Sequence, residues 1–269
     1  MSSESPRISQ QLESWYQRKN GRYLLTSLRQ ALEPILDVSF GYHILQMGVA
    51  PGCELYSQST INHRIYSAEQ PGSNVSLVSH SDELPLESDS IDTLIAHHSL
   101  EFGPNPHSVL REMQRVLAPQ GHMLIVGFNP YSLLGAGASL GRIARNPLWR
   151  AQHPVSRHRL SDWLHLLGCE VQSCSHVYGL PPIGSGKLHA LLTRGDAWSN
   201  SHNLPVGGLY VLHAIKQVGA LNKPRMRLRE RGERLIGLAV PKPSAAPSPA
   251  PAAVPGSTRT LKKPGEAAA

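Results

Sequence analysis

The chain has 269 residues, of which 40% are hydrophobic, and it carries a formal net charge of +7 at pH 7. This length and apolar content are sufficient for a substantial hydrophobic core. No apolar run reaches the roughly 18 residues that a membrane span requires, and residues 1–10 are polar, so we expect neither a membrane span nor a secretory signal. Three cysteines without CxxC spacing favour a reduced, cytoplasmic location.

The positive charge is concentrated near the C-terminus. Residues 223–269 contain ten Lys and Arg against three Glu, so residues 1–222 are neutral overall. The segment begins with an Arg-rich cluster and continues from residue 241 as a Pro/Ala-rich stretch, a composition typical of disorder. We expect residues 223–269 to be a disordered tail, either a solvated linker or a weak electrostatic binder of RNA, DNA or acidic lipid.

The N-terminal third predicts a helix and two strands. Residues 18–36 carry leucines at helical spacing and form a cover helix, into which Trp15 and Tyr16 lead. Residues 42–47 form the first expected strand, followed by a glycine-containing loop at 48–52. Residues 63–67 form the second.

The central segment reads as strand, strand, helix and strand. Apolar runs at 75–78 and 92–96 predict two strands. Asn105 and Pro106 are an N-cap and a first helical residue, and Pro119 to Gly121 are expected to stop the helix before a buried strand at 122–128. Such a strand, crossover helix and strand favours a right-handed parallel connection.

The remaining segments complete an α/β domain. Residues 160–167 predict a helix stopped by Gly168, and residues 170–174 and 209–215 predict two strands that pair as an antiparallel hairpin. Residues 128–154 form a long insertion rich in Gly, Arg and Leu.

The sequence pattern of residues 75–128 resembles that of the class I S-adenosylmethionine-dependent methyltransferases, in particular the type 11 group. That group reads roughly G-D-A-E-x-L-P-F, then S-F-D-x-V, then L-x-E-x-x-R-V-L-x-P-G-G. The counterparts in this chain stand in the same order, at Ser79 to Asp82, Leu84 to Leu86, Ser90 to Asp92 and Leu110 to Gly121.

The resemblance implies a doubly wound, Rossmann-like, mostly parallel seven-stranded sheet with helices on both faces. It also implies S-adenosylmethionine as cofactor and methyl transfer to a small or medium acceptor, which the insertion after the fifth strand helps to bind. The expected organisation is a helical cover at 1–38, a methyltransferase domain at 39–222 and the basic tail at 223–269.

The cofactor loop departs from the family pattern E/D-x-G-x-G-x-G, because Gln46, Gly48, Ala50 and Gly52 occupy its four positions. Gln46 lacks the charge of the family acid. Ala50 either has negative φ or carries strain of about 1–2 kcal/mol. We therefore expect a weakened or reshaped site, which Gln46→Glu with Ala50→Gly would tighten about tenfold. The alternative is a non-catalytic binding or scaffolding module.

Other cofactor contacts are expected after the second and third strands. The family places an acid at the end of strand 2 to hold the ribose hydroxyls, and Glu69 is the candidate, unless it is a solvated loop residue. The turn that contacts adenine contains His80, Ser81 and Asp82, with His80 replacing the family aspartate. His80 either donates to or stacks on the purine, or is an exposed turn residue.

Paired histidines follow the fourth strand. His97 and His98 lie where relatives line the cavity between cofactor and acceptor, so His97 is a candidate cofactor contact and one of the pair a candidate base. A metal site is not expected, because adjacent strand side chains point to opposite faces and no zinc spacing occurs. Asn129-Pro130-Tyr131 resembles the N-P-P-Y element of amino-directed nucleic-acid methyltransferases but follows the wrong strand, so it is interpreted as a turn.

Overall fold

The computed structural model describes residues 5–72, 74–143, 145–177, 194–195 and 207–217. The chain divides into residues 1–221 and 222–269, and every described residue lies in the first unit. The predicted basic tail therefore falls outside the described residues, and all strands and helices of the described structure belong to the first unit.

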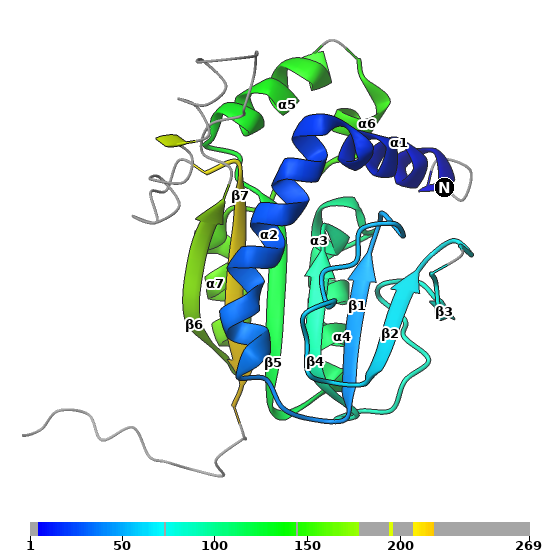
Figure 1. The fold of residues 1–269 in the computed structure, drawn as a ribbon, viewed down its shortest axis with the longest axis vertical. Coiled ribbons are helices and arrows are strands. Elements are labelled where there is room, and N and C mark those ends of the chain that lie inside the picture. Colours follow the sequence, from blue (N-terminus) through cyan, green and yellow to red (C-terminus); the bar gives the residue numbers. More distant parts are fainter. Residues whose placement is uncertain (1–4, 73, 144, 178–193, 196–206, 218–269) are drawn as a thin grey trace, which may run out of the picture. The chain divides into compact units, whose positions relative to one another are not determined.

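A seven-stranded sheet organises this unit (Figure 1). The strands are β1 (His43–Gly48), β2 (His63–Ala68), β3 (Leu77–Val78), β4 (Ile91–His97), β5 (Leu117–Phe128), β6 (Cys169–Val177) and β7 (Leu209–Lys216), in the order β3-β2-β1-β4-β5-β7-β6. Strands β1 to β5 pair in parallel, and β7 is antiparallel to both β5 and β6. The predicted doubly wound, mostly parallel sheet with its antiparallel hairpin is confirmed.

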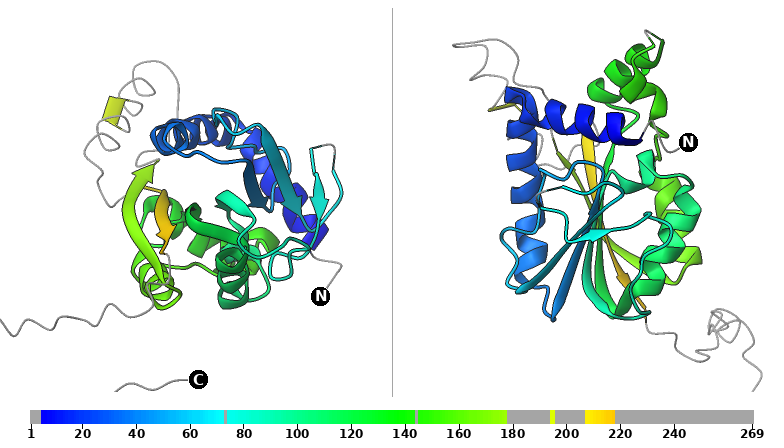
Figure 2. Two further views of the ribbon diagram at one scale, coloured as in Figure 1. Left: turned by 90° about the horizontal axis from the view of Figure 1, so that it is seen from below. Right: turned by 90° about the vertical axis from the view of Figure 1, so that its right-hand side faces the viewer.

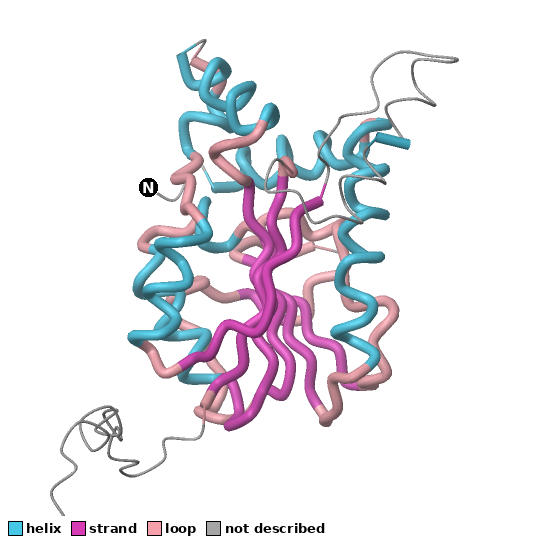
Figure 3. The backbone as a smooth tube through the Cα atoms, turned by 90° about the vertical axis from the view of Figure 1, so that its left-hand side faces the viewer, coloured by secondary structure: helices cyan, strands magenta, loops and turns pink. Residues whose placement is uncertain are grey.

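Helices cover both faces of the sheet (Figure 3). They are α1 (Ser5–Gln17), α2 (Lys19–Asp37), α3 (Ser99–Phe102), α4 (Pro106–Val116), α5 (Leu133–Ile143), α6 (Pro147–Ala151) and α7 (Arg157–Leu166). Successive strand residues serve different cores, as the period of two in a strand requires: Ile44 packs in the cluster that includes the α2 leucines, and Leu45 in the cluster that includes α4 and α7.

Two helix boundaries lie where local sequence signals predicted them. The Asn105 side chain accepts a hydrogen bond of 3.0 Å from the His107 N–H at the start of α4, as the N-cap interpretation predicts. Gly168 follows α7 with φ +75°, which a glycine adopts without strain. The predicted stop at Pro119 to Gly121 is too late, because α4 already ends at Val116 and β5 begins at Leu117.

The N-terminal segment forms a separate helix that the sequence interpretation did not predict. Helix α1 precedes α2, and the chain turns sharply between them at Arg18, which has extended backbone angles. A Cβ on Gly21 would lie 2.4 Å from the Trp15 carbonyl oxygen, so a glycine permits this corner. In Figures 1 and 2, α1 crosses beyond the carboxyl ends of the parallel strands. Among the described residues, no helix combines the length and apolarity of a transmembrane segment.

Candidate cofactor pocket and buried histidine network

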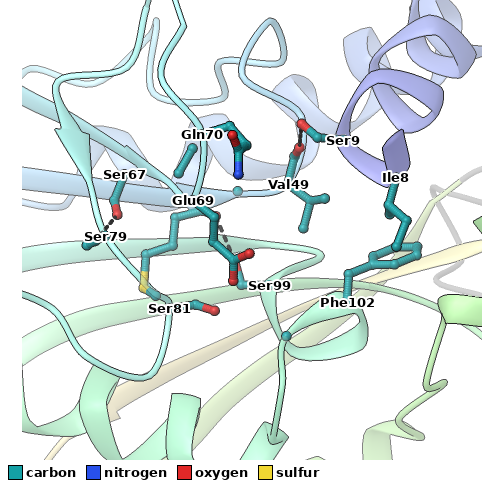
Figure 4. Close-up of a pocket in the computed structure, with 14 residues that line it drawn as sticks. Ile8, Ser9, Val49, Ser67, Glu69, Gln70, Ser79, Ser81, Ser99 and Phe102 are labelled. Atoms are coloured by element: carbon teal, nitrogen blue, oxygen red, sulfur yellow. Dashed lines mark hydrogen bonds between the residues drawn. The ribbon is translucent and has the colours of Figure 1, made fainter. Parts of the chain in front are cut away.

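A pocket opens at the carboxyl ends of β1, β2 and β4 (Figure 4). Its empty space, including the part open to solvent, is about 580 Å³, within the usual range of small-molecule sites. The strand order reverses between β1 and β4, which is the switch point where open α/β sheets bind ligands. The wall comprises Ile8, Ser9, Met47 to Val49, Ser67 to Gln70, Ser79, Ser81, Ser99, Phe102 and Gly103.

Helix α1 supplies one wall of this pocket. In Figure 4, Ile8 and Phe102 lie on one side, and Ser67, Glu69 and Gln70 on the other. The Ser9 hydroxyl donates a 2.5 Å hydrogen bond to the Val49 carbonyl oxygen, which fastens α1 to the loop after β1. The sequence interpretation missed Ile8 and Ser9, although helical spacing in residues 5–17 was the available signal.

Gln46 braces the loop after β1 instead of facing the pocket. Its side chain is fully buried, its Nε2 donates to the Cys53 carbonyl oxygen at 2.8 Å, and its Oε1 accepts from the Leu55 N–H at 2.8 Å. Both polar ends of the amide are thus used within the loop. A carboxylate at this position would lose the donor to Cys53.

Ala50 fits the loop without the backbone strain that a positive φ would bring. It does not have positive φ, and it is fully buried. Its carbonyl oxygen accepts from the Tyr66 hydroxyl at 2.8 Å. The same hydroxyl would lie 2.5 Å from a Cβ on Gly48, so the glycine is needed for close packing against Tyr66. The Tyr66 side chain therefore holds the loop after β1 in place.

The predicted cofactor residues separate into two groups. Gly48, Glu69 and Ser81 line the pocket, with Glu69 directly after β2. The other six, Gln46, Ala50, Gly52, His80, Asp82 and His97, are not among the lining residues. His80 pairs with Glu83 in an isolated bridge, and Asp82 lies in the turn between them. Gly52 faces α1, since a Cβ there would lie 2.6 Å from Oε1 of Glu13.

A hydrogen-bonded chain of buried titratable side chains begins at the carboxyl end of β4. The Tyr16 hydroxyl of α1 lies 2.9 Å from Nε2 of His97 and 2.6 Å from Nε2 of His98. Nδ1 of His98 lies 2.7 Å from Oε2 of Glu101, whose Oε1 accepts from the Phe128 N–H at 2.7 Å. The four titratable side chains are at most 1% exposed. We call Tyr16, His97, His98 and Glu101 the buried network.

Backbone and ring geometry hold His98 in the network. His98 has φ 58°, a left-handed conformation, and its ring stacks on Phe128 with centroids 4.1 Å apart. The left-handed turn at His98 brings both imidazoles to the hydroxyl of Tyr16. The sequence-based argument that adjacent strand side chains point to opposite faces did not predict this. Nδ1 of His97 is buried and has no hydrogen-bond partner in the described structure.

Burial favours the neutral form of every member of the network. It lowers the pKa of His98 to about 3, and burial with the neighbouring His98 lowers the pKa of His97 well below its usual range. Burial also raises the pKa of Glu101 well above its usual range, although hydrogen bonds from Phe128 and Gln152 oppose that shift. The pKa of Tyr16 is raised, first by burial.

Two proton arrangements satisfy every bond within the network. In the first arrangement Glu101 is ionised and accepts a hydrogen bond from Nδ1 of His98. The Tyr16 hydroxyl then donates to Nε2 of His98 and accepts from Nε2 of His97. Nδ1 of His97 carries no proton in this arrangement. One added proton at that Nδ1 reverses each bond and leaves Glu101 protonated. The network can therefore take a proton at His97 and hold it at Glu101 with all four groups neutral.

Comparisons with known proteins agree with the fold. Residues 36–125 match the family model described as methyltransferase domain. The chain is 27% identical over 225 residues to the uncharacterized protein YafS of Escherichia coli K12, covering 80% of this chain and 89% of that protein. A segment of 80 residues, 29% of this chain and 27% of the relative, is 32% identical to the malonyl-[acyl-carrier protein] O-methyltransferase of Halorhodospira halophila.

Solved structures show the same architecture. An S-adenosylmethionine-dependent methyltransferase of Thermotoga maritima superposes with a TM-score of 0.60 at 17% identity, covering 81% of this chain and 100% of that chain. One chain of a solved complex between the Trm112 methyltransferase activator of Haloferax volcanii and a methyltransferase superposes with a TM-score of 0.56 at 15% identity, covering 81% of this chain and 99% of that chain. Residues 36–125 therefore match a methyltransferase domain, and the described unit has the fold of solved S-adenosylmethionine-dependent methyltransferases.

Proposed function

We propose that the protein transfers the methyl group of S-adenosylmethionine to an acceptor, with the cofactor bound in the pocket at the ends of β1, β2 and β4. The observation that carries this proposal is the position of Glu69, which stands directly after β2 on the pocket wall. A carboxylate there can accept two hydrogen bonds from vicinal ribose hydroxyls. The pocket that Glu69 lines lies at the switch point of the sheet.

The remaining wall residues suit the rest of such a ligand. Gly48 and Val49 bring backbone to the pocket at the end of β1. Ile8 and Phe102 give an apolar side for a purine ring, and Ser81 offers a hydroxyl beside it. When bound, the cofactor supplies a sulfonium methyl group, and the protein's part in that displacement is mainly positioning.

We further propose that the buried network receives the proton of an acceptor that must lose one. Ser99, which lines the pocket, directly follows His98 and donates from its hydroxyl to the Met47 carbonyl oxygen at 2.9 Å. The network thus adjoins the pocket through Ser99, and because His97 is fully buried and does not line the pocket, the proton has to reach it through a group between them. His97 would take the proton at Nδ1, and Glu101 would hold it at the far end. The raised pKa of Glu101 supports this assignment.

Titration calorimetry with S-adenosylmethionine and S-adenosylhomocysteine tests the cofactor assignment. We expect both ligands to bind, and Glu69→Gln to weaken binding about tenfold, equivalent to about 1.4 kcal/mol. Glu87→Gln, an exposed carboxylate away from the pocket, is the matched control. Absence of binding by the wild-type protein would favour the non-catalytic binding or scaffolding module instead.

Infrared spectroscopy tests the proton assignment without knowledge of the acceptor. On acidification from about pH 9 to about pH 7, a range in which ordinary carboxyls stay ionised, the protonated Glu101 carboxyl should give a C=O band, and Glu101→Gln should remove it, since glutamine keeps the shape but cannot take the proton. A band that survives in Glu101→Gln would assign the proton to another carboxyl and end the relay proposal. Cofactor binding measured on the same variant separates this result from loss of the pocket.

We also infer a cytoplasmic location. Cys53 and Cys169 are free and buried. Burial raises the pKa of the Cys53 thiol to about 12, with a smaller contribution from Glu13, so this cysteine is an inert packing residue. Free thiols are typical of a reducing compartment. Fractionation of cells with detection of the full chain would test this.

A further inference from the structure

The helix that follows β5 exposes large apolar side chains to solvent. On and before α5, Tyr131 is 80% exposed, Leu140 66% and Ile143 79%. Three of the eight large hydrophobic side chains that are exposed in the described structure therefore lie within thirteen residues. Apolar patches of this kind usually mark an interaction surface.

Exposed arginines accompany these apolar side chains along the chain, and this segment of the sequence contains no acidic residue. Arg142, Arg145 and Arg150 are exposed on α5, the following turn and α6. From residue 113 to residue 161 the sequence contains six Arg and neither Asp nor Glu. The surface thus combines exposed aliphatic groups with guanidinium groups that have no acidic neighbour in sequence.

The two helices form a braced hairpin. The Asn146 N–H donates to the Gly141 carbonyl oxygen at 2.9 Å, and a Cβ on Gly141 would lie 2.5 Å from the Trp149 ring, so α5 and α6 pack closely. The hairpin projects beyond the carboxyl ends of the strands, as the right-hand view of Figure 2 shows. Its exposed face is therefore preformed and accessible to a flat surface at the end of the molecule that carries the pocket.

We propose that the α5–α6 hairpin docks on a lipid bilayer that contains anionic headgroups. Charge complementarity selects this occupant: a bilayer offers acidic phosphates to the three arginines and an apolar interior to Leu140 and Ile143. A nucleic acid would satisfy the arginines but gives no place to the aliphatic groups. A second group of exposed apolar side chains, Val38, Phe40 and Tyr42, has acidic neighbours instead of arginines. Asp37 precedes it, and the Asp92 side chain accepts hydrogen bonds from the N–H groups of residues 42 and 43.

The lipid proposal is independent of methyl transfer, and its test measures binding. The full chain is sedimented with vesicles of phosphatidylglycerol and phosphatidylcholine in equal parts, and with phosphatidylcholine alone. We expect binding to the mixed vesicles and little to the neutral ones. The double variant Leu140→Ser, Ile143→Ser should bind about tenfold more weakly at the same salt concentration, equivalent to about 1.4 kcal/mol.

A matched variant controls for the loss of exposed apolar groups elsewhere. Val38→Ser with Leu166→Ser removes side chains that are 58% and 85% exposed and lie outside the hairpin, so its vesicle binding should equal that of wild type. Arg145→Gln with Arg150→Gln should weaken binding and reduce its dependence on salt. The basic tail is present in every protein compared, so its contribution cancels.

Three outcomes would overturn the proposal. Equal binding by wild type and the Leu140→Ser, Ile143→Ser variant would assign all lipid affinity to other basic segments. Failure of wild type to bind mixed vesicles would exclude the surface as a lipid contact. Sedimentation velocity that shows a wild-type dimer, dissociated by the same double variant, would make a second copy of the chain the occupant.

Discussion

The hydroxyl of Tyr16 lies 2.6 Å from Nε2 of His98, so a residue of the N-terminal helix bonds directly to the turn after β4. These residues are 82 positions apart in the chain. Because α1 also lines the pocket through Ile8 and Ser9, this bond holds a pocket wall in place from the protein interior.

Tyr16→Phe should lower the free energy of unfolding by about 1–3 kcal/mol, because it leaves buried nitrogens of two histidines without their partner. Urea denaturation monitored by circular dichroism would measure the change. Tyr131→Phe, at a hydroxyl on an 80% exposed side chain, should be neutral. Equal stability of Tyr16→Phe and wild type would mean that water replaces the phenol.

Gly48→Ala should destabilise the protein and reduce cofactor affinity, because the new methyl group would meet the Tyr66 hydroxyl at 2.5 Å and displace it from the Ala50 carbonyl oxygen. Gly137→Ala in α5 is the matched control. No atom lies within 4 Å of a Cβ at that position, so the change should stabilise the helix by about 0.5–1 kcal/mol. Thermal unfolding and calorimetry would report both effects.

Gln46→Glu should lower stability and leave cofactor affinity unimproved. The substitution places a carboxylate, in a fully buried site, against the Cys53 carbonyl oxygen that now accepts a hydrogen bond. The expected cost is about 1–3 kcal/mol or more. This outcome replaces the sequence-based expectation of tighter binding. Gln70→Glu, in the pocket wall, controls for added charge, and a tenfold gain in affinity by Gln46→Glu with Ala50→Gly would restore the sequence-based interpretation.

The free energy of unfolding should fall as the pH drops from 6.5 towards 4, partly through His213. Burial and the nearby His122, whose Nδ1 lies 3.0 Å from Nε2 of His213, lower the pKa of His213 to about 4. In this window the unfolded chain binds a proton that the folded His213 does not, so protonation favours unfolding. Urea denaturation at several pH values should give a flatter profile for His213→Gln. An unchanged profile would assign the pH dependence to other groups.

The sequence located the sheet well because its strands are marked by short apolar runs and its helices by local capping groups. Asn105 and Gly168 act within one turn of their own backbone, so their roles can be inferred from neighbouring residues alone. The separate helix α1 was missed because its break at Arg18 depends on the close approach of Gly21 to Trp15, a contact between helices.

The site was less predictable because its contacts connect distant segments. Family spacing located Gly48, Glu69 and Ser81 on the pocket wall. It assigned Gln46 to the ligand, whereas the amide bonds to Cys53 and Leu55. The buried network could not be predicted either, because it depends on the left-handed turn at His98.

The amide of Gln46 gives the loop after β1 a shape that is set when the chain folds. Ligand binding then need not order that segment, and the entropy that a mobile loop would lose on association does not oppose binding. A loop without the family acid can in this way be preorganised, so the missing charge is a poor measure of how well the site receives its ligand.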